Sequence, residues 1–174
     1  MLKFVSLAFA LMAGPVFAQV DQGPKNVPEF SPAFKNQTRA PEIRDGTRLA
    51  TEVLATGLAH PWGVEVLPDG SYLVTERVGR LSLVGADGQV TRVSGVPNVL
   101  AQRQGGLLHI ALADDFETAR RLYLTSSKPL NARRNATAAA TALLSDDGTT
   151  LTDLEDNFVQ TPPSRSAMHF GSRI

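Results

Sequence analysis

The chain has no cysteine among its 174 residues, which excludes a disulfide framework. It also lacks an excess of charge of either sign, since 17 basic residues balance 17 acidic ones. The basic residues are scattered, and the pair Arg133-Arg134 stands among Asn and Ala as in a solvated loop, so no nucleic-acid partner is indicated. Nucleotide-binding glycine loops, zinc-ligand spacings and Ser-His-Asp arrangements are absent as well. Packing must therefore hold the fold.

One long apolar run is present, and it lies at the N-terminus. Lys3 precedes an apolar stretch over residues 4–13, a Gly14-Pro15 break and the sequence Val-Phe-Ala ending at Ala18. This layout is typical of a secretory signal peptide. A membrane span needs about 20 apolar residues, and a buried helix would show an amphipathic period. We therefore predict a signal peptide over 1–18 with no membrane span, and a periplasmic or secreted bacterial protein, which the lack of cysteine suits.

Residues 19–50 differ from the rest of the chain in composition. Four prolines, at 24, 28, 32 and 41, punctuate a segment rich in Asn, Gln and charge. Because proline removes a backbone donor and fixes φ, no regular element runs through that spacing. We predict a Pro-rich N-terminal arm, with Phe30 and Phe34 as its candidate anchors.

After residue 50 the sequence becomes a series of short apolar runs separated by turns. Asp-Gly pairs at 69–70, 87–88 and 147–148 lie between such runs, which is a strong hairpin signal. The pattern predicts two antiparallel meanders of four strands. Their strands are expected at 62–67, 71–76, 80–84 and 89–94, then at 106–112, 121–126, 136–144 and about 150–160.

The meanders indicate an all-β propeller, whose blades of four strands recur about every 40 to 50 residues. A glycine stands near the start of each round, at Gly63, Gly106 and Gly171, and a third round is expected to begin with a strand at His169. The longer second interval is absorbed by loops expected at 127–136 and 162–166. First strands of blades line the central channel, so Gln104 and His169 are predicted to face one site.

Six phrases of the sequence carry a family resemblance. They are residues 57–63 (GLAHPWG), 67–70 (LPDG), 73–77 (LVTER), 79–81 (GRL), 104–108 (QGGLL) and 169–173 (HFGSR). Together they resemble the soluble aldose sugar dehydrogenases that depend on pyrroloquinoline quinone (PQQ), the glucose/sorbosone dehydrogenase family. The resemblance implies a six-bladed β-propeller, of which residues 51–174 would form about the first two blades and the start of a third, truncated at the C-terminus.

The resemblance also implies a chemistry and a set of site residues. The family oxidises an aldose at its anomeric hydroxyl with PQQ and Ca²⁺ and an external electron acceptor that no motif here specifies. His169 matches the catalytic histidine, a general base, and imidazole suits that task because it titrates near pH 6.5. Gln104 and Arg173 are the candidate substrate- and cofactor-binding residues. No metal ligand is assigned within this sequence; those ligands are expected beyond residue 174.

Some residues depart from the family pattern or have structural alternatives. His109 and Asp114 replace residues of other types, and Met168 stands where the glucose-oxidising branch has an acidic residue, which favours the broader aldose branch. His60 is interpreted as structural, with Trp62 packed under the first blade, and His109 as a histidine between blades. Asp114-Asp115 is interpreted as a turn cap.

A second function class fits the same phrases. A noncatalytic periplasmic propeller could use them for packing and hold a ligand at the channel mouth, although it would have no reason to keep His169 and Gln104 in register. Two blades alone would also leave an open sheet face and an unpaired edge. We therefore expect the 174-residue product alone to be poorly soluble and inactive.

Overall fold

The computed structural model describes residues 27–34, 46 and 49–174, which fall into two units, 1–51 and 52–174. The predicted signal peptide lies outside the described residues. Of the predicted arm, the described part contains a turn in which Phe30 N donates to Val27 O at 3.1 Å, and both Phe30 and Phe34 are exposed there. None of the described helices is long and apolar enough to cross a membrane.

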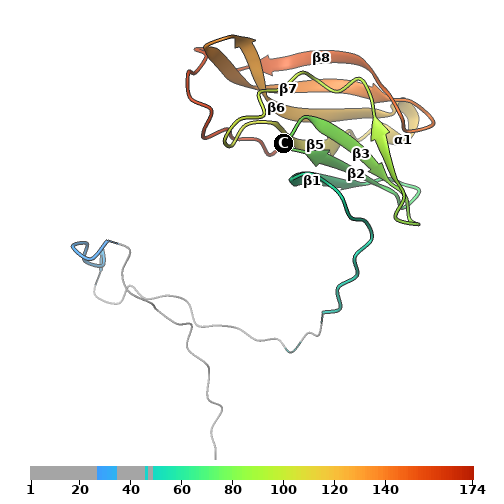
Figure 1. Cartoon of the computed structure of the whole chain (residues 1–174), viewed down its shortest axis with the longest axis horizontal. Helices are drawn as coiled ribbons and strands as arrows, with labels where there is room; N and C mark the ends of the chain where they lie inside the picture. Colours follow the sequence, from blue (N-terminus) through green and yellow to red (C-terminus); the bar gives the residue numbers. More distant parts are fainter. Residues whose placement is uncertain (1–26, 35–45, 47–48) are drawn as a thin grey trace, which may run out of the picture. The chain divides into compact units, whose positions relative to one another are not determined.

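The second unit consists of two four-stranded antiparallel meanders (Figure 1). The first sheet is formed by β1 (Pro61–Val66), β2 (Tyr72–Glu76), β3 (Arg80–Val84) and β4 (Val90–Val93). The second is formed by β5 (Leu107–Leu112), β6 (Arg121–Asn131), β7 (Arg134–Leu144) and β8 (Leu151–Val159), with the short helix α1 (Phe116–Ala119) between β5 and β6. All eight predicted strands of the two meanders are present, in sequential order within each sheet.

Aspartates close the predicted hairpin turns through local hydrogen bonds. In the turn between β1 and β2, Ser71 N and Ser71 Oγ donate to Asp69 Oδ1 at 2.9 and 2.6 Å, and these bonds lower the pKa of Asp69. Asp147 accepts from Ser145 and from Thr149 in the same manner before β8, and its pKa is lowered too. The glycine after each aspartate has a positive φ, which is the property that makes Asp-Gly a turn signal.

The structure corrects several local predictions. The loop expected at 127–136 is instead a long hairpin, because β6 and β7 stay paired up to Asn131 and Arg134. Arg133 lies exposed in its turn, whereas Arg134 belongs to β7 and donates through Nη1 to Pro163 O at 3.1 Å. No strand begins at His169, whose φ of 64° interrupts an extended conformation.

The core lies where the two sheets pack together. β1 and β2 contact β5, and the buried cluster joins Leu73, Leu81 and Val93 of the first sheet to Ile110, Leu122 and Leu124 of the second. Gly63 lies at this junction, where a Cβ would stand 3.1 Å from Leu108 O. Trp62 is 54% exposed, so the prediction that it packs under the first sheet is wrong. Strand alternation turns its neighbour Gly63, rather than Trp62, toward the seam.

Candidate functional site

Gln104 and His169 meet although they lie far apart in the sequence. His169 N donates to Gln104 Oε1 at 2.7 Å, and Gln104 N donates to Ala167 O at 3.2 Å. Both residues are exposed, Gln104 in the loop before β5 and His169 in the segment after β8. The structure thus brings together the two residues that were predicted to face one site, while their chemical roles stay predictions.

The loop that carries Gln104 is fastened to both sheets. Ser127 Oγ of β6 accepts from Gly106 N at 2.7 Å and donates to Leu100 O at 2.8 Å. From the first sheet, the Arg77 guanidinium donates to Arg103 O and, at 3.4 Å, to Gly105 O. Because Ser127 is fully buried, water does not compete for its hydroxyl. Gln104 is therefore displayed on an anchored loop.

Glycine is required at position 106, next to this loop. Its φ is +152°, and a Cβ there would lie 1.9 Å from Arg77 O. Leu107 N donates to that same carbonyl at 3.3 Å, so the backbones of the two sheets approach closely at this point. Packing between the sheets thus explains Gly106, whereas a Cβ at Gly105 would meet Leu100 O of its own loop at 2.5 Å and Ser127 Oγ of β6 at 2.6 Å.

The segment around His169 is held by its backbone. Thr125 Oγ1 of β6 donates to Ser172 O at 2.6 Å, and Ile174 N donates to His109 Nδ1 at 3.5 Å. Figure 1 shows the C-terminal residue beside β5. Among the described residues, neither the His169 imidazole nor the Arg173 guanidinium has a hydrogen-bonding or ionic partner. Both residues are exposed.

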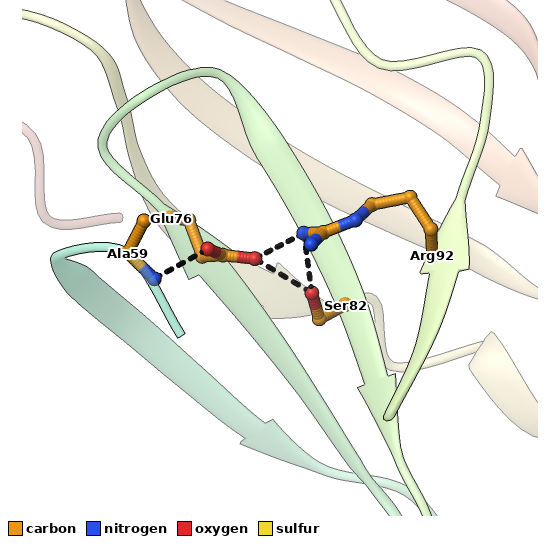
Figure 2. A network of polar contacts seen from close by, with 4 residues as sticks. All are labelled: Ala59, Glu76, Ser82 and Arg92. Carbon is orange, nitrogen blue, oxygen red and sulfur yellow. Dashed lines mark hydrogen bonds and ion pairs between the residues drawn. The ribbon is translucent and has the colours of Figure 1, made fainter. Parts of the chain in front are cut away.

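A buried ionic network in the first sheet was not predicted from the sequence. The Glu76 side chain is fully buried, accepts from Ala59 N at 2.6 Å and Ser82 Oγ at 2.7 Å, and forms an ion pair with Arg92 (Figure 2). Burial, the largest single influence, raises the pKa of Glu76, but these bonds together outweigh it and leave the pKa below its ordinary value. The carboxylate is therefore held ionised.

The signal for this network lies in the strand register. Ser82 is the direct partner of Arg92 across β3 and β4, and Val74, two residues before Glu76, is the partner of Ser82 across β2 and β3. Because side chains two apart on a strand share a face, the three polar side chains lie together. The network fixes the chain at Ala59, next to His60, whose carbonyl accepts from Arg77 N at 3.0 Å. It thereby supports Arg77, which holds the Gln104 loop.

Other charged candidates have structural roles. Asp115 is the residue that precedes α1 and forms an ion pair with Arg121 at 3.1 Å, although its side chain makes no capping hydrogen bond. His109 lies in β5, with its backbone N–H bonded to Thr125 Oγ1 at 3.0 Å. Across the described part of the chain, no group of three or more His, Cys, Asp or Glu side chains could hold a metal ion.

Comparison with known proteins places this chain in a family. The family model described as Glucose / Sorbosone dehydrogenase matches residues 58–174. The chain belongs to the glucose/sorbosone dehydrogenase family. It is 41% identical over 125 residues to the aldose sugar dehydrogenase YliI of Escherichia coli K12, which covers 71% of this chain and 34% of that protein. An uncharacterised Synechocystis protein, slr1608, is 39% identical over 148 residues, covering 79% of this chain and 34% of the relative.

Solved structures agree with this assignment. The apo-form of the soluble aldose sugar dehydrogenase from Escherichia coli superposes with a TM-score of 0.67 at 40% identity, covering 70% of this chain and 36% of that one. The PQQ-bound aldose sugar dehydrogenase from Streptomyces coelicolor gives a TM-score of 0.59 at 31% identity, covering 70% and 36%. The fold is therefore that of a partial β-propeller, and the chain spans about a third of the length of these relatives.

Proposed function

We propose that the protein to which this chain belongs oxidises an aldose at its anomeric hydroxyl, with PQQ as the cofactor. Membership of a sugar dehydrogenase family and a PQQ-bound relative support the class of reaction. The observation that carries the proposal for this chain is the hydrogen bond from the backbone N–H of His169 to Gln104 Oε1, which brings two exposed residues that are distant in the sequence to one place.

His169 is proposed as the general base. When the sugar is oxidised to its lactone, the anomeric O–H loses a proton and the anomeric carbon loses a hydride, for which PQQ would be the acceptor. The His169 imidazole would take the proton, and its freedom from partners among the described residues leaves it able to do so.

Gln104 and Arg173 are proposed to contact substrate or cofactor. The Gln104 side chain uses Oε1 to accept from His169 N, so its amide N–H groups remain to donate to a carbonyl or hydroxyl oxygen. The exposed guanidinium of Arg173 suits a carboxylate of PQQ. These donors fit the quinone. The described side chains form no group that fits Ca²⁺.

The cellular setting is part of the proposal. The signal-like layout of residues 1–18 supports export to the periplasm or medium, where the sugar and an external electron acceptor would be met. Since the chain spans about a third of its relatives, we propose the activity for the whole protein and expect the 174-residue chain alone to be inactive.

The test is sugar-dependent reduction of a dye by the purified product of the complete gene. We expect turnover with a panel of aldoses after PQQ and Ca²⁺ are added, and none when PQQ is omitted. Calorimetric binding of a sugar without turnover in the PQQ-loaded protein would contradict the proposal and favour the noncatalytic binding propeller.

A further inference from the structure

The two sheets contain the same irregularity at the same place. Between β1 and β2 the register shifts between Pro61 and Val64, and between β5 and β6 it shifts between Leu107 and Ile110. Pro61 stands opposite Glu76 and Leu107 opposite Ser126, so the residues just before these partners, Thr75 and Thr125, face the two bulges. A bulge leaves backbone groups outside the ladder, and these need other partners.

A threonine hydroxyl supplies those partners in each sheet. In the first, Thr75 Oγ1 accepts from Gly63 N at 2.8 Å and donates to Leu108 O of the next sheet. In the second, Thr125 Oγ1 accepts from His109 N at 3.0 Å and donates to Ser172 O at 2.6 Å. Thr75 is fully buried and Thr125 is 3% exposed, so water competes for neither hydroxyl. Each hydroxyl thus links its own first strand to the segment that follows its sheet.

The two threonines have equivalent acceptors. Ser172, whose carbonyl accepts from Thr125, corresponds to Leu108, whose carbonyl accepts from Thr75. Leu108 lies at the start of β5, four residues after Gln104, and Ser172 lies three residues after His169. The His169 segment is consequently anchored on both sides, by Gln104 Oε1 at His169 N and by Thr125 Oγ1 at Ser172 O. Of these two anchors, only Thr125 is buried.

We propose that Thr125 is a positioning residue, which fixes the His169 segment by donating to the Ser172 carbonyl, as Thr75 fixes β5 by donating to the Leu108 carbonyl. The placement of His169 for catalysis rests on the proposed function above. The link itself does not. Removing the hydroxyl leaves the Ser172 carbonyl and the His109 N–H without partners, which frees the segment to shift.

Threonine-to-valine substitutions test the link, since valine keeps the shape and loses the hydroxyl. Hydrogen exchange measured by mass spectrometry on the complete protein should show amides of residues 168–174 exchanging at least about 10-fold faster in Thr125→Val than in wild type. Thr75→Val should leave that peptide unchanged and accelerate exchange in residues 107–112. Thr125→Ser, which retains the hydroxyl, should match wild type. Unchanged exchange of 168–174 in Thr125→Val, or equal acceleration there in Thr75→Val, would overturn the proposal.

Sugar oxidation gives a second readout. A shift of about 1 Å at a catalytic group can cost on the order of 100-fold in rate, so kcat should fall at least about 10-fold in Thr125→Val. Thr125→Ser should retain kcat within about 3-fold. If Thr125→Val fails to fold, Thr125→Ser decides: wild-type exchange and kcat support the link, and loss of both overturns it. If wild type oxidises no sugar, the function proposal fails while the exchange experiment still judges the link.

Discussion

The two sheets have the same strand arrangement and the same bulge, but their buried side chains differ. Each has a bulge on its first strand and a threonine opposite, yet Glu76 of the first sheet is replaced in the equivalent place by Ser126 of the second. Glu76 forms a buried ionic network, whereas the buried face of β7 carries Ala136, Ala138, Ala140 and Ala142. Hydroxyl-to-backbone bonds are therefore common to both sheets, whereas the buried charge is present only in the first.

The largest effect is expected from the buried charge. Glu76→Ala removes a fully buried carboxylate whose ionic partner, Arg92, is half-exposed. It leaves Ala59 N–H and Ser82 Oγ without their acceptor at about 1–3 kcal/mol each, so we expect a loss of about 3–5 kcal/mol in the free energy of unfolding. Ser126→Ala, at the equivalent place, should cost about 1 kcal/mol or less. Urea denaturation followed by circular dichroism measures both. Equal losses would show that the sheets do not differ in this respect.

Next in size is the contact between the sheets at Gly106. Gly106→Ala brings a Cβ against Arg77 O, and we expect it to cost about 3 kcal/mol. Gly70→Ala is the matched control, because Gly70 also has a positive φ but faces open space; it should cost about 1 kcal/mol. Thermal unfolding distinguishes them. A similar cost at both positions would mean that the backbone conformation, rather than the seam, matters.

The ionic network also predicts a pH dependence. The pKa of Glu76 is lower in the folded protein than its ordinary value of 4.5, so its stabilising effect is present above that value and is lost as the pH falls through the folded pKa. At pH 7, Glu76→Gln should be less stable than wild type by about 1.5–3 kcal/mol. Melting curves recorded from pH 7 to 3 should show that this difference in stability between the two proteins stays constant down to about pH 4.5 and becomes smaller below it. A stability difference that grows as the pH falls would contradict a lowered pKa of Glu76 in the folded protein.

The smallest effect is expected from an exposed ion pair of the second sheet. Arg121 and Asp115 are 45% and 41% exposed, so Arg121→Gln should cost at most about 1 kcal/mol. Salt at about 1 M should remove the difference from wild type, because it screens exposed charges. A loss as large as that of Glu76→Ala would remove the contrast between the two sheets.

Local signals made the strands and turns predictable. Asp69-Gly70 and Asp147-Gly148 form the expected hairpins because the side chain and the positive φ act within a few residues. The exposure of Trp62 and the length of the β6–β7 hairpin depend on partners distant in sequence, so the alternation of residues could not specify them.

The candidate site was predictable to a similar extent. Gln104 and His169 each stand near the start of a sequence repeat, which predicted that they lie at one site. The hydrogen bond from His169 N to Gln104 Oε1 is present. The role of Ser127 could not be inferred, because the sequence does not indicate which distant backbone groups a serine in a strand will bond. From the sequence, Glu76 could be identified only as a charged residue in a strand. Its burial depends on hydrogen bonding to Ser82 of β3 and on the ion pair with Arg92 of β4.

Two histidine variants test the proposed role of His169 as the base in sugar oxidation. His169 and His60 are both exposed and both have a positive φ, 64° and 53°, which asparagine tolerates. In the complete, PQQ-loaded protein we predict that His169→Asn lowers kcat for aldose oxidation by about 100- to 10,000-fold, while His60→Asn leaves it within about 3-fold. Equal activity of His169→Asn and His60→Asn would contradict the account.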